Sequence, residues 1–84
     1  MRFVYILECA DNTLYTGITT DINRREEEHN FSEKWAKYTK SRRPVKMIFY
    51  QECESRSDAS KKEYAIKQLT RIQKFELISW KREL

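Results

Sequence analysis

The chain has 84 residues, of which 39% are hydrophobic and 36% charged, with one glycine and one proline. This length and composition predict a single domain over residues 1–84 with a small core, and they exclude collagen-like and low-complexity proteins. The net charge of +4 is uneven, because residues 1–33 hold three basic and seven acidic side chains and the remainder is strongly basic. Cys9 and Cys53 form no CxxC pair, which argues against a zinc cluster or a disulfide framework and favours a cytoplasmic protein. Glu8 interrupts the apolar N-terminal run, so we expect neither a signal peptide nor a membrane span.

The first half of the chain predicts a β-hairpin. Residues 2–9 alternate in polarity as a strand does, Asp11 and Asn12 supply turn chemistry, and residues 14–18 form a second strand. Tyr5 and Tyr15 lie inside this hairpin. Gly17 follows in the second strand, and a lone glycine in a strand indicates a bulge or a close approach to the backbone.

A helix is expected next, with Thr20 or Asp21 as its N-cap, His29 near its end and Asn30 as the residue that ends it. Arg25 and His29 are four residues apart and therefore share one face of this helix. Residues 30–43 are predicted to be a long loop.

The second half predicts one strand and two helices. Pro44 begins a third strand that continues to about Glu52, and Ser57 caps a helix that carries Glu63 near its middle. Thr70-Arg71-Ile72-Gln73 is a capping box that begins the last helix, whose apolar stripe is Ile72, Phe75 and Ile78. The expected fold is α+β, a three-stranded antiparallel sheet flanked by helices in the order ββαβαα.

The predicted loop and the start of the third strand are strongly basic. No acidic residue occurs between positions 34 and 51. Basic and aromatic side chains alternate there, a combination that suits phosphates and exposed bases. Candidate nucleic-acid contacts are therefore Lys34, Trp35, Lys37, Tyr38, Lys40, Arg42, Arg43 and Lys46. The alternative is a solvated loop whose charges keep a small domain soluble.

Five side chains are candidates for catalysis. Each has a plain structural explanation of its own: the two tyrosines as cross-strand packing, Arg25 with His29 as a solvated pair, and Glu63 as a partner of Lys67. Together they provide a base for water, positive charge for a developing oxyanion and a carboxylate for a divalent cation, which hydrolysis of a phosphodiester requires. The set is Tyr5, Tyr15, Arg25, His29 and Glu63, and it is meaningful only if these residues share a pocket.

The order and spacing of these residues resemble a known pattern. Val4-Tyr5, Tyr15-Thr16-Gly17, Arg25, His29 and Glu63 look like the motifs of the GIY-YIG nuclease superfamily. Further segments resemble its small stand-alone bacterial members, the YhbQ-like group: Leu14 to Thr20, Glu28-His29-Asn30, Lys37-Tyr38-Thr39 and Arg42 to Lys46. The resemblance extends from Phe3 to about Trp80.

The resemblance implies an endonuclease that hydrolyses nucleic acid, with DNA favoured over RNA and RNA left open, with little sequence preference or with selectivity for DNA structure, in repair or processing. By the family's pattern, Tyr15 or Tyr5 orients or deprotonates water, Arg25 stabilises phosphoryl charge and Glu63 holds Mg²⁺ or Mn²⁺. His29 relays a proton or steadies the nucleophile, and Gly17 lets the backbone and substrate approach.

The chain also departs from the pattern. Phe3 and Thr16 replace the usual residues of the two name-giving motifs, and no asparagine follows the helix that carries Glu63, where Gln68 or Gln73 is at best a substitute. No appended domain selects a site, so a protein partner could supply specificity. The alternative function is a nucleic-acid-binding or nuclease-recruiting module with little catalytic activity.

Overall fold

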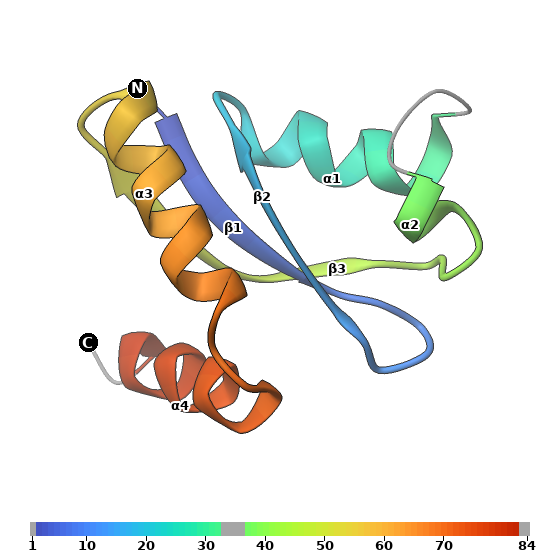
Figure 1. Cartoon of the computed structure of the whole chain (residues 1–84). Helices are drawn as coiled ribbons and strands as arrows, with labels where there is room; N and C mark the ends of the chain where they lie inside the picture. Colours follow the sequence, from blue (N-terminus) through green and yellow to red (C-terminus); the bar gives the residue numbers. More distant parts are fainter. Residues whose placement is uncertain (1, 33–36, 83–84) are drawn as a thin grey trace.

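The computed structural model describes residues 2–32 and 37–82. Its centre is an antiparallel sheet of β1 (Arg2–Glu8), β2 (Leu14–Thr19) and β3 (Lys46–Cys53), arranged in the order β2-β1-β3. Figure 1 shows the long hairpin of β1 and β2 crossing the molecule between the helices. The predicted hairpin, third strand and α+β class are confirmed, although β3 begins at Lys46 rather than at Pro44.

Alternation along β1 separates the two faces of the sheet. Tyr5, Leu7 and Cys9 form one buried cluster with Val45, whereas Val4 and Ile6 belong to the core on the opposite face. The β1–β2 register is continuous and places Tyr5 opposite Gly17. The irregularity of the sheet lies instead between β1 and β3, at Ile6 and Leu7. Gly17 therefore marks a close approach and not a bulge.

In the part of the chain that the structure describes, four helices surround the sheet: α1 (Ile22–Phe31), α2 (Lys37–Lys40), α3 (Arg56–Lys67) and α4 (Arg71–Arg82). Figure 1 shows α1 and α3 on opposite sides of the sheet, with α4 following α3. The one-turn helix α2 corrects the sequence interpretation, which predicted a loop over residues 30–43. Its residues include none of the strong signals for a helix start, since no acidic side chain lies in its first turn.

The helix ends follow local hydrogen bonds. Asp21 caps α1 by accepting from the backbone N–H of Arg24, and the predicted capping box of α4 is present between Thr70 and Gln73. The cap of α3 is Ser55, not Ser57, and it accepts from the N–H of Asp58.

The roles predicted for Asn30 and Ile72 were wrong. Asn30 does not end α1, since the helix continues to Phe31, and its side chain instead forms hydrogen bonds with the backbone of Val45. Ile72 is 72% exposed and takes no part in the apolar stripe of α4, whereas Ile78 is buried against the sheet.

Among the described residues, no helix is both long enough and apolar enough to cross a bilayer.

Candidate active site

A chain of buried hydrogen bonds forms the centre of the site. The Tyr5 hydroxyl oxygen lies 2.9 Å from Nε2 of His29, and Nδ1 of the same ring lies 2.8 Å from Oγ1 of Thr39. These side chains come from β1, α1 and α2, and each is at most 1% exposed. Because both ring nitrogens have a partner, the imidazole is fixed in its orientation.

Gly17 provides the space that the ring of Tyr5 occupies. A Cβ atom at Gly17 would lie 2.5 Å from the hydroxyl oxygen of Tyr5 and 2.7 Å from its Cζ. These separations are far shorter than van der Waals contact, so any side chain at position 17 would displace the tyrosine. The close approach predicted for the chain's single glycine is therefore made by a catalytic candidate.

Tyr15 adds a second aromatic ring to this cluster. Its ring centroid lies 5.2 Å from that of His29 and 6.5 Å from that of Tyr5. Tyr15 is half-buried, whereas Tyr5 is fully buried. Of the two tyrosines, Tyr15 is thus the one that solvent reaches.

Arg25 brings positive charge to the cluster, as its position one helical turn from His29 predicts. Its positive charge acts on the Tyr5 hydroxyl and lowers the pKa of that group, and its Nε lies 3.2 Å from Oε1 of Glu28. These contacts orient the cation between the sheet and α1.

Glu63 reaches the same region from α3, which packs against both β1 and β2. Its negative charge is close enough to Tyr5 to raise the pKa of that hydroxyl. Glu63 also forms the ion pair considered from the sequence, with its Oε2 3.4 Å from Nζ of Lys67. The fold therefore brings a carboxylate from a distant part of the chain within electrostatic range of the tyrosine cluster.

Burial keeps Tyr5 protonated. Desolvation raises the pKa of its hydroxyl well above the usual value, and Tyr15 and Glu63 raise it further, while Arg25 acts in the opposite direction. The sequence interpretation required nearby positive charge to favour a phenolate. Arg25 supplies such charge, but burial outweighs it, so Tyr5 is a neutral hydrogen-bonding group at neutral pH.

His29 is also neutral. Burial, together with the charges of Arg25 and Arg43 and against the opposing effect of Glu28, lowers the pKa of its imidazole from 6.5 to about 4. A neutral imidazole has one donor nitrogen and one acceptor nitrogen, which matches its two different partners.

The lowered pKa of His29 predicts a pH dependence of stability. Between about pH 6.5 and pH 4 the unfolded chain binds a proton at His29 that the folded protein does not, so the free energy of unfolding should fall as the solution is acidified through this window. Urea titrations at several pH values measure this slope. In His29→Gln the slope over the window should flatten, and an unchanged slope would contradict the assignment.

The side chains around the tyrosine cluster limit which metal the site fits. Among the residues that the structure describes, no three His, Cys, Asp or Glu side chains come together as a metal cluster. Zinc or calcium usually has three or more protein ligands, whereas Mg²⁺ is commonly bound by one or two carboxylates plus water and substrate phosphates. The residues present therefore fit Mg²⁺ or Mn²⁺ better than those metals, and Glu63 is the carboxylate that would hold such an ion.

The basic candidates divide into several groups. Lys34 and Trp35 lie outside the described residues, and for Lys37 and Tyr38 only the backbone, at the start of α2, is described. Lys40 and Lys46 are exposed. Arg42 forms an ion pair with Asp11, with 2.9 Å between Nε and Oδ2. The described side chains among the eight candidates therefore do not form a single basic surface.

Arg43 is turned toward the protein. Its Nε donates to the carbonyl oxygen of His29 over 2.6 Å, and its Nη2 donates to the carbonyl of Ser32. These carbonyls lie at the C-terminal end of α1, where orphan acceptors need partners. Asn30 makes two further bonds to the backbone of Val45 and so joins the same helix end to the segment before β3.

Arg43→Ala is expected to lower the free energy of unfolding by about 1.5–3 kcal/mol, because it leaves charge-assisted hydrogen bonds to partly buried carbonyls unmade. The matched control is Arg42→Ala, whose half-exposed ion pair should contribute less than about 1 kcal/mol. Urea denaturation measures both. Equal effects of the two substitutions would contradict this distinction.

Sequence reasoning missed Thr39, Arg43 and Asn30 as supports of His29 and its helix. Thr39 was quoted only as part of a motif, and Arg43 only as a nucleic-acid contact. A polar residue buried in a predicted basic loop has no local sequence signature. These contacts depend on the tertiary fold and were not recognisable from spacing.

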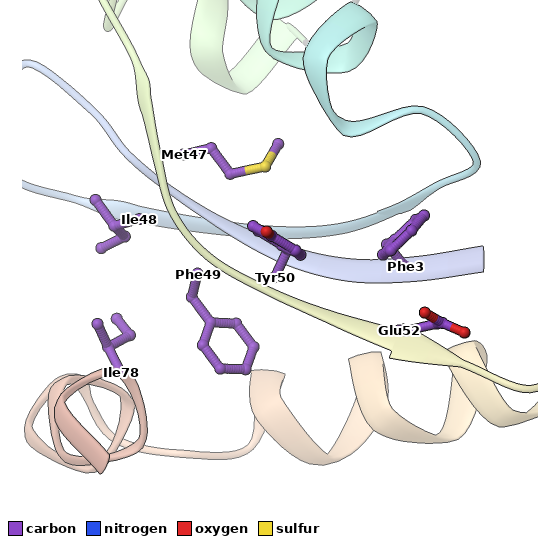
Figure 2. Close-up of a pocket in the computed structure, with 7 residues that line it drawn as sticks. All are labelled: Phe3, Met47, Ile48, Phe49, Tyr50, Glu52 and Ile78. Atoms are coloured by element: carbon purple, nitrogen blue, oxygen red, sulfur yellow. The ribbon is translucent and has the colours of Figure 1, made fainter. Parts of the chain in front are cut away.

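A cavity of about 490 Å³ lies away from this cluster, along β3. Figure 2 shows Phe49 facing Ile78 of α4 on one side of the strand and Tyr50 with Met47 on the other. Its lining is mostly apolar and includes none of the catalytic candidates. The catalytic candidates from the sequence therefore do not line this cavity.

Comparison with known proteins defines the class. Residues 1–76 match the family described as the GIY-YIG catalytic domain, so the chain belongs to the GIY-YIG family, a nuclease superfamily. Within this family it is similar to small bacterial proteins that carry the designation UPF0213. UPF0213 protein DP2720 of Desulfotalea psychrophila is 60% identical over 76 residues, which cover 90% of this chain and 69% of that protein.

Solved structures of relatives support the same fold. The NMR structure of UPF0213 protein BH0048 from Bacillus halodurans has 44% sequence identity and a TM-score of 0.62, covering 96% of this chain and 86% of that one. The NMR structure of protein EF2693 from E. faecalis has 42% identity and a TM-score of 0.65, covering 99% of this chain and 88% of that one.

Proposed function

We propose that this protein is a metal-dependent endonuclease that hydrolyses DNA phosphodiester bonds with little sequence preference or with selectivity for DNA structure, in bacterial DNA repair or processing. The observation that carries the proposal is the convergence of Tyr5, Tyr15, Arg25 and His29, with Glu63 within electrostatic range. Membership of the GIY-YIG family supports a nucleic-acid substrate.

Exposure and hydrogen bonding indicate different roles for the two tyrosines in the reaction. Tyr15 is the tyrosine that reaches solvent, so its hydroxyl is the one to orient or deprotonate the attacking water. Tyr5 is hydrogen-bonded to His29 and lies in the field of Arg25, and its burial disfavours a phenolate. In this proposal Tyr5 and His29 are positioning residues that hold Arg25 and the aromatic cluster in place.

Arg25 and Glu63 supply the charge that the reaction needs. Hydrolysis places additional negative charge on the phosphoryl oxygens, and a fixed guanidinium stabilises that charge without reorganising. Glu63 holds Mg²⁺ or Mn²⁺, which when bound acts as a Lewis acid on the phosphate. In this step the phenolate form of Tyr15 takes one proton from the water, the water oxygen bonds to phosphorus, and the bond to the leaving oxygen breaks as that oxygen takes a proton from solvent.

The test is cleavage of labelled single-stranded, duplex and flap DNA, and of RNA, with Mg²⁺, with Mn²⁺ and with EDTA. We expect cleavage of DNA that EDTA abolishes, and the preferred substrate defines the structural selectivity. Absence of cleavage under all these conditions would contradict the proposed activity.

A second candidate is a nucleic-acid-binding or nuclease-recruiting module, favoured by the acid-free basic segment between positions 34 and 51. If Lys40 and Lys46 contact phosphates of duplex DNA, replacing each by alanine should make the slope of log affinity against log salt shallower by about 0.9. Fluorescence anisotropy over a salt series measures this slope. Lys62→Ala, which removes an ion pair with Asp58 on α3, is the control and should leave the slope unchanged.

A further inference from the structure

The orientation of the imidazole can be derived from the donors around it. The buried Tyr5 hydroxyl lies 2.9 Å from Nε2 of His29 and faces the positive charge of Arg25, a side chain with donors only, so its hydrogen points to Nε2. In a neutral imidazole the other nitrogen carries the hydrogen. Nδ1–H therefore donates to Oγ1 of Thr39, 2.8 Å away.

We propose that Thr39 is a positioning residue, whose hydroxyl holds His29 in the Nδ1–H tautomer and so orients Tyr5 and Arg25 for the reaction. Its catalytic part rests on the proposed nuclease function. Three groups from β1, α1 and α2 then form a chain in which both hydrogen bonds run in one direction, from Tyr5 through His29 to Thr39, with the charge of Arg25 acting on its first member.

A chain with one direction is stabilised by mutual polarisation. The cation of Arg25 makes the Tyr5 hydroxyl a better donor, and donation to Nε2 makes Nδ1–H a better donor in turn. Burial strengthens each bond because the local dielectric is low, and it makes an unpaired Nδ1–H costly. Loss of the Thr39 hydroxyl should therefore reverse the tautomer or release the ring.

The protein contains a single histidine, so its imidazole can be observed without ambiguity. In ¹⁵N-labelled protein near pH 7, long-range proton–nitrogen spectra distinguish a protonated from an unprotonated ring nitrogen. We expect wild type and Thr39→Ser to show protonated Nδ1 and bare Nε2. Thr39→Val, which matches threonine in shape and lacks the hydroxyl, should show a reduced Nδ1–H population.

Two results would overturn the inference: an Nε2–H tautomer in wild type, or a Thr39→Val spectrum identical to that of wild type. If Thr39→Val does not fold, the protonation of Nδ1 in wild type and in Thr39→Ser still tests the predicted tautomer. In cleavage assays Thr39→Val should lower kcat about 10- to 100-fold with KM unchanged, and Thr39→Ser should restore it. A wild type that shows the predicted tautomer but cleaves nothing would refute the nuclease function and not the tautomer.

Discussion

Glu63→Gln is expected to reduce metal-dependent cleavage at least about 100-fold while the protein remains folded. Glutamine keeps the size of the side chain and removes the negative charge that would bind the cation. The same substitution breaks the partly exposed ion pair with Lys67, which should cost less than about 1 kcal/mol of unfolding free energy. Single-turnover cleavage at several Mg²⁺ concentrations, together with thermal unfolding, measures both effects.

Lys67→Met is the matched control for this prediction. It removes the same ion pair and leaves the Glu63 carboxylate in place, so its cleavage rate should stay within about twofold of wild type. If the lysine variant lost as much activity as Glu63→Gln, the ion pair rather than a metal-binding carboxylate would be the important feature.

Gly17→Ala is expected to destabilise the protein by about 1–3 kcal/mol, the usual cost of overpacking a filled interior. The added Cβ would lie 2.5 Å from the Tyr5 hydroxyl oxygen, so the tyrosine must leave its place between Arg25 and His29. Cleavage should fall in parallel. Thermal unfolding and the imidazole spectrum of His29 measure the two consequences.

When Tyr5 is replaced by a shorter side chain, Gly17→Ala should no longer lower the stability of the protein. Gly17 has no positive φ, so its backbone accepts alanine, and alanine in a strand is intrinsically better than glycine by about 0.5–1 kcal/mol. In a Tyr5→Leu background, which lacks the outer ring atoms, Gly17→Ala should therefore be neutral or stabilising. A penalty that persists there would show that the tyrosine is not the obstacle.

Local patterns were sufficient to predict most of the fold. The alternation in residues 2–9 predicted the two faces of β1, and Thr70 with Gln73 predicted the start of α4, because these signals depend only on near neighbours in the chain. Ser55 and Ser57 were indistinguishable as caps on residue type alone. The exposure of Ile72 depends on where α4 meets the sheet, which periodicity does not reveal.

The candidate site was less accessible to such reasoning. Spacing placed Arg25 and His29 on one helical face, and the unusual single glycine indicated a close approach. That Tyr5 fills the space beside Gly17, and that Thr39 meets the far side of the imidazole, follow from the crossing of β1, α1 and α2 in space. Whether the named residues act in catalysis and binding stays a prediction until variants are measured.

Thr39 and Arg43 hold the same histidine at two points, one at its ring and one at its carbonyl oxygen. Both contacts come from the segment that carries the exposed Lys40 and precedes β3. Opening of this segment would release the ring and the helix end together, so the two regions should behave as one cooperative unit in local unfolding. Hydrogen exchange of the backbone amides near the end of α1 and in α2 should then occur with a common opening free energy. A polyanion bound by Lys40 and Lys46 would slow exchange in both regions.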